Sequence, residues 1–322
     1  MDMEHPGSHL ATRMFFSYKN QPPEMQNDIL ESEKYKGLIS MKILSCGAGQ
    51  QSTALALMSC EKAMNKKEIY PLVPVYDAVL FCDLGGEREW VYRQVDFIAM
   101  CCKEVGIPFY VLKDKNLKED YLTNYGTARV CTIPFWSIDE NGKKGKMTRH
   151  CTIDYKIVQM QNFVRWNLLR YRKGQRTKPE DIQAHEMHIG FTYEEQQRIF
   201  DSKHKLFVNK FPMVEMGLTR ADNYAYVKEH WGLETKGSAC LFCPFHTNYF
   251  FSECKRNCQK DYQVILNIDE KLEHGVPDSR IGVPNSKVFI SRSRKRIRDL
   301  LPEECNDAEY FHYKDQQMWN GF

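Results

Sequence analysis

The feature that most constrains the fold is an alternation of short apolar runs with helical stretches, which begins at residue 41. Residues 41–44 form the first apolar run, and apolar side chains gather again at 78–82 and 108–112. Between these runs, apolar side chains recur every three or four residues, a spacing typical of helices that bury one face. Strands that alternate with helices over short connections favour a parallel sheet with helices on both faces. The sequence therefore predicts an α/β fold with a Rossmann-like parallel sheet.

Later segments extend the alternation. Apolar side chains at helical spacing from Ile153 to Leu168 predict an amphipathic helix, and residues 188–191 predict a further strand. Residues 113–147 are expected to be rich in loops. Helices are expected over 220–230 and, as one or two pieces, over 251–272.

Composition excludes several classes of protein. Of the 322 residues, 42% are hydrophobic and 27% charged, which is typical of a folded globular chain. No apolar run approaches the roughly 20 residues of a membrane-spanning helix, and the first residues lack the apolar core of a secretory signal. We therefore expect a cytoplasmic protein with no membrane partner. The net charge of +3 does not by itself indicate a nucleic-acid-binding protein.

The chain has 12 cysteines, an excess for a protein expected in the reducing cytoplasm. The most informative pair is Cys240-x-x-Cys243, because two thiolates at this spacing can bind one metal ion or cluster and a distant third can complete the site. Adding Cys254 and Cys258 gives an alternative, a four-thiolate zinc site. Buried thiols without a metal are the third possibility. Core packing is the simplest interpretation of Cys60, Cys101 and Cys102, which lie on the apolar faces of expected helices.

A loop of small residues follows the first expected strand. Residues 45–52 read Ser-Cys-Gly-Ala-Gly-Gln-Gln-Ser, and small residues at 47–49 allow the backbone to approach a ligand closely. The helix that follows offers backbone N–H groups and a positive dipole end to an anion. The loop lacks the Gly-Lys-Ser/Thr ending of a Walker loop and the G-x-G-x-x-G spacing of dinucleotide folds. It therefore predicts a different kind of phosphate-binding loop, and a tight turn without a ligand is the alternative.

This loop resembles the pyrophosphatase loop of the adenine nucleotide alpha-hydrolase superfamily, and most closely its form in phosphoadenosine phosphosulfate reductase-like proteins. Three further segments resemble motifs of that group in the same order: VLFCDLGGE at 79–87, RHCTIDYKI at 149–157 and SACLFCPF at 238–245. Within the group, the chain resembles the DNA phosphorothioation sulfurtransferase type. Residues 1–40 have few periodic apolar positions and are expected to be an N-terminal extension. We expect a nucleotide-binding domain at 41–200 and a smaller, mostly helical C-terminal part at 201–322.

The resemblance also implies that the loop binds ATP, whose alpha-phosphate is the reacting centre. The residues that it assigns to nucleotide binding are Ser45, Gly47, Gly49, Gln51, Ser52 and Glu87. Gln51 occupies the position of an aspartate that helps to bind Mg²⁺ in many ATP pyrophosphatases, so Asp83 or Glu87 is expected to supply the oxygen ligand instead.

Sulfur chemistry is the second implication. The resemblance implies a [4Fe–4S] cluster on Cys151, Cys240 and Cys243, with zinc as the alternative metal. The fourth iron would be ligated by another group or left open to accept sulfur. Arg149 and Lys156 lie on either side of Cys151 and, with Asp83, are the expected catalytic residues.

The function implied is that of an ATP-dependent adenylating sulfurtransferase, acting on a nucleic-acid or nucleotide acceptor and supplied by a sulfur donor such as a cysteine desulfurase. Basic clusters at 143–149 and 292–298 suit a phosphate backbone, although a solvated charged face explains the second equally well. A reductase of phosphoadenosine or adenosine phosphosulfate is an alternative, but Glu304-Cys305 lacks the glycine and histidine that follow the cysteine in assimilatory reductases. A zinc-stabilised nucleotide- or nucleic-acid-binding module is the non-enzymatic alternative.

Overall fold

A computed structural model describes residues 40–65, 70–124, 132–273, 286–301 and 305. The extension expected at 1–40 lies outside these residues except for Ser40, as does Glu304 of the reductase comparison. The chain forms two compact units, each assembled from three segments. Among the described residues, unit 1 contains those of 40–82, 89–112 and 160–238, and unit 2 contains those of 83–88, 113–159 and 239–305. The division at 41–200 and 201–322 stays a prediction.

Unit 1 is built on a five-stranded sheet in which every neighbouring pair of strands is parallel. The strands are β1 (Lys42–Cys46), β2 (Ala78–Cys82), β3 (Phe109–Leu112), β6 (His185–Ile189) and β7 (Phe207–Lys210). Their order is β3-β2-β1-β6-β7, so β1 is central, with Ser45 opposite Leu80 on one side and Ile189 on the other. This confirms the predicted α/β class with a parallel sheet flanked by helices.

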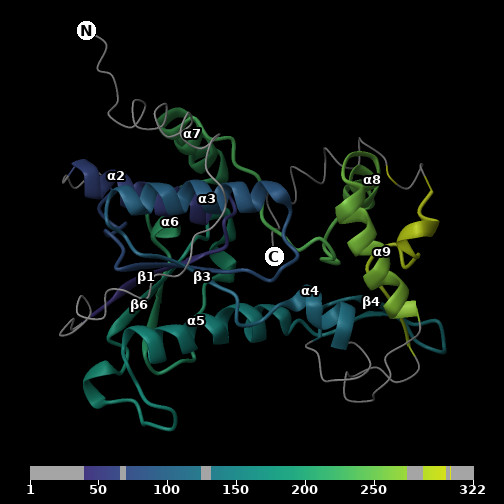
Figure 1. Ribbon diagram of the computed structural model, residues 1–322, viewed down its shortest axis with the longest axis horizontal. Coiled ribbons are helices and arrows are strands. Elements are labelled where there is room, and N and C mark those ends of the chain that lie inside the picture. Colours follow the sequence, from purple (N-terminus) through teal and green to yellow (C-terminus); the bar gives the residue numbers. More distant parts are fainter. Residues whose placement is uncertain (1–39, 66–69, 125–131, 274–285, 302–304, 306–322) are drawn as a thin grey trace. The chain divides into compact units, whose positions relative to one another are not determined.

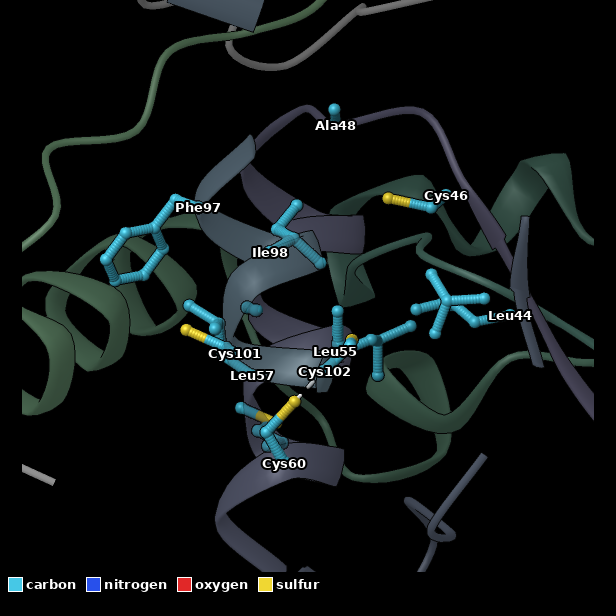
Figure 2. Packing of buried hydrophobic residues seen from close by; sticks show 14 of the residues in the cluster. Leu44, Cys46, Ala48, Leu55, Leu57, Cys60, Phe97, Ile98, Cys101 and Cys102 are labelled. Carbon is cyan, nitrogen blue, oxygen red and sulfur yellow. Dashed lines mark hydrogen bonds between the residues drawn. The ribbon is translucent and has the colours of Figure 1, made fainter. Parts of the chain in front are cut away.

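Three of the four α-helices that the structure describes wholly within unit 1 were predicted, and the short one at Pro212–Glu215 was not. The four are α2 (Gln50–Asn65), α3 (Glu89–Glu104), α6 (Pro212–Glu215) and α7 (Arg220–Trp231). In Figure 1, α2 and α3 run along the same side of the sheet. Figure 2 shows the core between them, where the thiols of Cys60 and Cys102 are buried with their sulfur atoms 3.7 Å apart. The interpretation of these cysteines as core residues is confirmed.

The helix predicted from Ile153 to Leu168 forms, with a change of winding. Its middle is α5 (Val158–Phe163), and π-helical turns precede it at Ile153–Ile157 and follow it at Val164–Leu168. A π-helical turn contains more residues than an α-helical turn, so it shifts side chains around the axis. Ile153 is 46% exposed, and its predicted place on the buried face is wrong.

Unit 2 combines a small antiparallel sheet with helices. The sheet has the order β5-β4-β8, from Lys144–Lys146, Trp136–Ile138 and Lys287–Phe289. The helices are α4 (Leu117–Glu119), a π-helical turn at Asp120–Asn124, α8 (Asn248–Asn257) and α9 (Gln259–Glu273). Thus 113–147 holds two strands that the sequence did not predict, whereas the helices expected over 251–272 are confirmed as two pieces.

Short 3₁₀ helices complete the described elements, at Pro179–Asp181, Tyr193–Arg198 and Ile297–Asp299. No helix in the described part of the chain is both long and apolar enough to cross a bilayer.

Candidate nucleotide and cysteine sites

The small-residue loop makes a tight connection between β1 and α2. Ala48 has a φ of 51°, in the left-handed region, and the Gly47 N–H donates to Ser52 Oγ at 3.1 Å. Gln94 of α3 holds the loop from the other side: its amide donates to the Ala48 carbonyl and, at 3.2 Å, to the Lys236 carbonyl. The loop therefore has a fixed conformation supported by buried polar contacts.

Close backbone packing explains the small residues. A Cβ at Gly49 would lie 3.0 Å from Ser238 Oγ. A Cβ at Gly190, the residue after β6, would lie 2.9 Å from the Ser52 nitrogen and 3.1 Å from the Gln51 carbonyl carbon. Gly190 thus supports the start of α2, a role that the sequence did not predict.

The loop follows the central strand, from which the chain builds the sheet first toward one edge and later toward the other. From β1, the chain continues to β2 and β3 on one side of the sheet, and later to β6 and β7 on the other. In open parallel sheets, connections that leave in opposite directions at the carboxyl ends of two neighbouring strands create the usual ligand-binding position. The loop at 47–49 follows β1, and Gly190 follows the adjacent strand β6. The topology thus places the predicted phosphate loop at a ligand-binding position of this fold class.

Gln51 belongs to a polar cluster that the sequence did not predict. Its amide donates to Glu195 Oε2 at 3.1 Å. Glu195 is buried and also contacts Arg198 and the Arg220 guanidinium, the latter at 2.9 Å. The capping pattern Thr192-x-x-Glu195 was a visible signal for this turn. The amide of Gln51 is therefore bound to a carboxylate in the structure.

Ser45 is also engaged within unit 1, because its hydroxyl donates to Met160 Sδ at 3.3 Å. Ser45, Gly47, Gly49, Gln51 and Ser52 thus all lie in unit 1, on β1, the loop or the first turn of α2. The other predicted site residues lie in unit 2; they are Asp83, Glu87, Arg149, Cys151, Lys156, Cys240 and Cys243.

Glu87 is the buried carboxyl group of unit 2. Its Oε1 lies 3.8 Å from Lys156 Nζ and 3.9 Å from Cys240 Sγ, and its buried Oε2 has no hydrogen-bond partner in the described part of the chain. Burial raises the pKa of Glu87, and the charge of Lys156 opposes the shift. The structure thus brings together two predicted site residues, Glu87 and Lys156, with one of the predicted metal ligands.

The Cys240-x-x-Cys243 segment forms a turn, closed by a hydrogen bond of 3.0 Å from the Cys243 N–H to the Cys240 carbonyl. The Leu241 N–H donates to the Gly86 carbonyl at 2.7 Å, which attaches the turn to the segment that carries Glu87. The pKa of Cys243 is raised to about 12, mainly by burial and to a smaller extent by the nearby Cys151, while the Phe245 backbone N–H and Arg149 oppose the shift. Burial also raises the pKa of Cys240, again with a contribution from Cys151.

The three predicted metal-binding cysteines therefore lie within electrostatic reach of one another. Across the residues that the structure describes, no three or more His, Cys, Asp or Glu side chains form a group that could hold a metal ion.

Cys254 has different surroundings from those of Cys240 and Cys243. The buried Arg88 donates to Cys254 Sγ and pairs with Glu253 at 3.2 Å and Asp261 at 3.3 Å. Its guanidinium also lies 5.3 Å from the centre of the Phe250 ring. These contacts join residues 83–88 to α8 and α9, and they give Cys254 a structural role.

Asp83 and Arg149 make local contacts. Asp83 Oδ1 accepts the Gly85 N–H at 2.8 Å, which is the turn-forming role that short acidic side chains commonly have. Arg149 Nε donates to Thr152 Oγ1 at 3.1 Å. Their predicted catalytic roles stay predictions.

No protein-family model matches the chain, and no curated protein matches its sequence. The class that the described residues define is an α/β protein with a five-stranded parallel sheet.

Proposed function

We propose that this protein is an ATP-dependent sulfurtransferase of the adenine nucleotide alpha-hydrolase type, which adenylates a nucleic-acid or nucleotide acceptor and then transfers sulfur to it. The observation that carries the proposal is the loop at 47–49, because it leads from the central strand into a 16-residue helix at the reversal of strand order. The four-motif resemblance supports the choice of ATP.

In this proposal the backbone of the loop binds phosphate oxygens. The first N–H groups of an α-helix have no partner within the helix, and its dipole favours negative charge at that end. Ser52 accepts the Gly47 N–H, and its own hydroxyl hydrogen can donate to a phosphate oxygen. These fixed donors would stabilise the charge that grows on the alpha-phosphate as the acceptor oxygen bonds to phosphorus and pyrophosphate leaves.

Unit 2 would supply the sulfur chemistry. A [4Fe–4S] cluster on Cys151, Cys240 and Cys243 would, when bound, hold the sulfur that replaces AMP on the acceptor. Two observations support this site: the charges of Cys240 and Cys243 each interact with that of Cys151, and Oε2 of Glu87 is buried without a hydrogen-bond partner among the described residues. The described side chains do not by themselves form a group that could hold a metal ion, so cluster binding would require the three thiols to move closer together. Lys156 neutralises part of the charge on Glu87. Mg²⁺ is the second proposed cofactor, as the cation that accompanies the phosphates of ATP.

A matched pair of serine variants tests the loop. Ser52→Ala removes a donor to a charged phosphate and is expected to weaken ATP binding by about tenfold or more. Ser59→Ala is the control: Ser59 lies on the same helix and accepts the Tyr76 N–H at 2.9 Å, a contact remote from the loop. Calorimetric titration with ATP and Mg²⁺ measures both. Normal ATP binding by a folded Ser52→Ala protein would contradict the proposal.

Two product assays and a metal analysis separate the sulfurtransferase from its alternatives. Acceptor-dependent release of pyrophosphate from ATP, with iron and sulfide in anaerobically purified protein, is the expected result. Release of sulfite from phosphoadenosine phosphosulfate would instead favour a reductase. Stoichiometric zinc without either reaction would favour a binding module.

A further inference from the structure

The small sheet of unit 2 has one face that combines cations with aromatic rings. Side chains at paired positions of antiparallel strands share a face, and here Trp136 is opposite Lys146 and Phe289. The next row on this face is Ile138 with Lys144 and Lys287, and all three lysines are exposed. Ser137 and Val288 alternate with these residues and are buried, whereas the three lysines are exposed, so the lysines lie on the outward face. Phe289, at the edge of this face, is covered, with the Arg296 guanidinium 4.7 Å from the centre of its ring.

The cations on this face lie directly over the rings. Lys146 Nζ is 5.6 Å from the centre of the Trp136 ring and 4.9 Å from that of Phe245. Arg294 lies 5.3 Å from the Trp136 ring, and Arg149 lies 5.9 Å from the Phe245 ring. These distances are typical of cation–π contacts. The rings and the charges therefore form one continuous surface.

Backbone contacts fix this surface in place. Arg294 has a φ of 59°, and its guanidinium donates to the carbonyls of Ser137 at 3.1 Å and Gly145 at 3.3 Å. The indole N–H of Trp136 donates to the Pro244 carbonyl at 2.8 Å. Because Pro244 and Phe245 directly follow Cys243, the surface continues into the cysteine turn.

In the three strands of this sheet and the turn between β4 and β5, all of which the structure describes, acidic side chains occur only in the turn. The turn between β4 and β5 contains Asp139 and Glu140. Asp139 Oδ1 accepts the backbone N–H groups of Asn141 and Lys143, at 2.9 and 2.8 Å, so it serves the turn. The cations that remain on or beside the face are Lys144, Lys146, Lys287, Arg149 and Arg294.

We propose that this face, made by Trp136, Lys144, Lys146, Phe245, Lys287 and Arg294, binds single-stranded nucleic acid. Aromatic and guanidinium planes can stack on unpaired bases of any sequence, while lysines pair with the phosphates. A duplex keeps its bases stacked on one another and offers only phosphates to such a surface. The bound strand would be held beside Cys240 and Cys243, where sulfur is transferred. That this strand is also the sulfur acceptor rests on the proposed function, whereas the binding of the strand to the face does not.

Anisotropy of a fluorescent oligothymidylate of about 20 nucleotides, measured without ATP at several salt concentrations, tests the proposal. Lys144→Glu/Lys146→Glu is expected to weaken binding roughly tenfold or more, and to lower the log–log salt slope by about 0.7 for each phosphate that the variant no longer neutralises. The control, Lys255→Glu/Lys260→Glu, makes the same change in charge at exposed positions of α8 and α9 and is expected to bind nearly as the parent does. If the charge reversal disturbs folding, Lys144→Gln/Lys146→Gln, which only removes the two charges, tests the same expectation of weaker binding.

Two further probes separate stacking from charge. A strand of the same length without bases, and a duplex of the same sequence, are both expected to bind more weakly than oligothymidylate. Equal binding of the baseless strand, equal weakening by both lysine pairs, or no binding of oligothymidylate would overturn the proposal. If the protein binds oligothymidylate but not ATP, the nucleic-acid site stands and the proposed function is wrong. If it binds ATP but not oligothymidylate, the nucleic-acid site is wrong and the proposed function stands.

Discussion

The lack of a side chain at Gly190, which follows β6, allows the backbone there to pack closely against the first turn of α2. The neighbours that a Cβ would meet at this position include backbone atoms of Gln51 and Ser52, which cannot rotate away as a side chain can. Extra atoms in a close-packed site force the backbone to shift, at a typical cost of about 1–3 kcal/mol.

Gly190→Ala is therefore expected to lower the free energy of unfolding by about 1–3 kcal/mol and to weaken ATP binding. Gly237→Ala is the matched control, because a Cβ there meets nothing within 4 Å. Urea denaturation and ATP titration of both variants measure the effect. A Gly190→Ala protein as stable as the control would show that α2 begins farther from β6 than described.

The sequence predicted those site residues that lie close to one another in the chain. The small residues at 47–49 were visible because strand, loop and helix follow one another directly. Gly190 and Glu195 lie about 140 residues later, and only the pairing of β1 with β6 brings them to the loop. Without a three-dimensional arrangement, neither residue carries a signal that links it to residues 45–52.

A buried, neutral histidine links the start of β6 to Met41, the residue before β1. His185 is fully buried, and its Nδ1 accepts the Met41 N–H at 3.2 Å, which requires an unprotonated Nδ1. Burial lowers the pKa of His185, against a smaller opposing effect of Asp181. Burial likewise lowers the pKa of His188 on the same strand. The folded state therefore binds these protons less readily than the unfolded chain does.

This strand is expected to make stability depend on pH. The contribution of the neutral histidines is fully present above the ordinary histidine pKa of about 6.5 and is lost as the pH falls below it, because the unfolded chain takes up protons first. Thermal unfolding at pH 7.5, 6.5 and 5.5 measures the trend. His185→Asn should flatten the decline, and His150→Asn, at an exposed position, should not. Identical slopes for parent and His185→Asn would exclude His185 as the cause.

The elements predicted best were those with an uninterrupted apolar pattern. β1, β2 and β3 are apolar runs, and α2, α3 and α7 follow regular spacing, so each was found close to its observed bounds. β6 has the sequence His-Glu-Met-His-Ile, and because its first residues are mostly polar, the predicted strand began only at residue 188. β4 and β5 have three residues each, too few to show alternation. The π-helical turns around α5 leave no signature in hydrophobic spacing.

For the whole molecule, the two units are interleaved in the sequence. Residues 83–88 and 113–159 interrupt unit 1 and belong to unit 2, whose remaining segment begins at 239. The motif after β2, which carries Asp83 and Glu87, is thus part of unit 2 although its flanking elements are part of unit 1. The order of motifs along the chain shows nothing about which segments pack together, so this interleaving could not be predicted from the sequence.

Truncation is expected to reveal this interleaving. A fragment of residues 1–200 lacks β7 and α7, whose Tyr226, Val227 and Trp231 belong to the core of unit 1, and should not unfold cooperatively. A fragment of residues 1–238 retains every segment of unit 1 and should show a cooperative transition. Circular dichroism during heating measures both. A cooperative 1–200 fragment would instead support a domain boundary near residue 200.

The central position of β1 in the sheet determines how slowly the structure around it opens. Amides of a strand with partners on both sides exchange their hydrogens with solvent mainly when the surrounding structure opens as a unit. β1 has β2 and β6 as partners, and Ile43 and Leu44 are fully buried. The loop at 47–49 is thus anchored to one of the slowest-opening parts of unit 1. A ligand there would meet donors that are already ordered and would lose little affinity to ordering them.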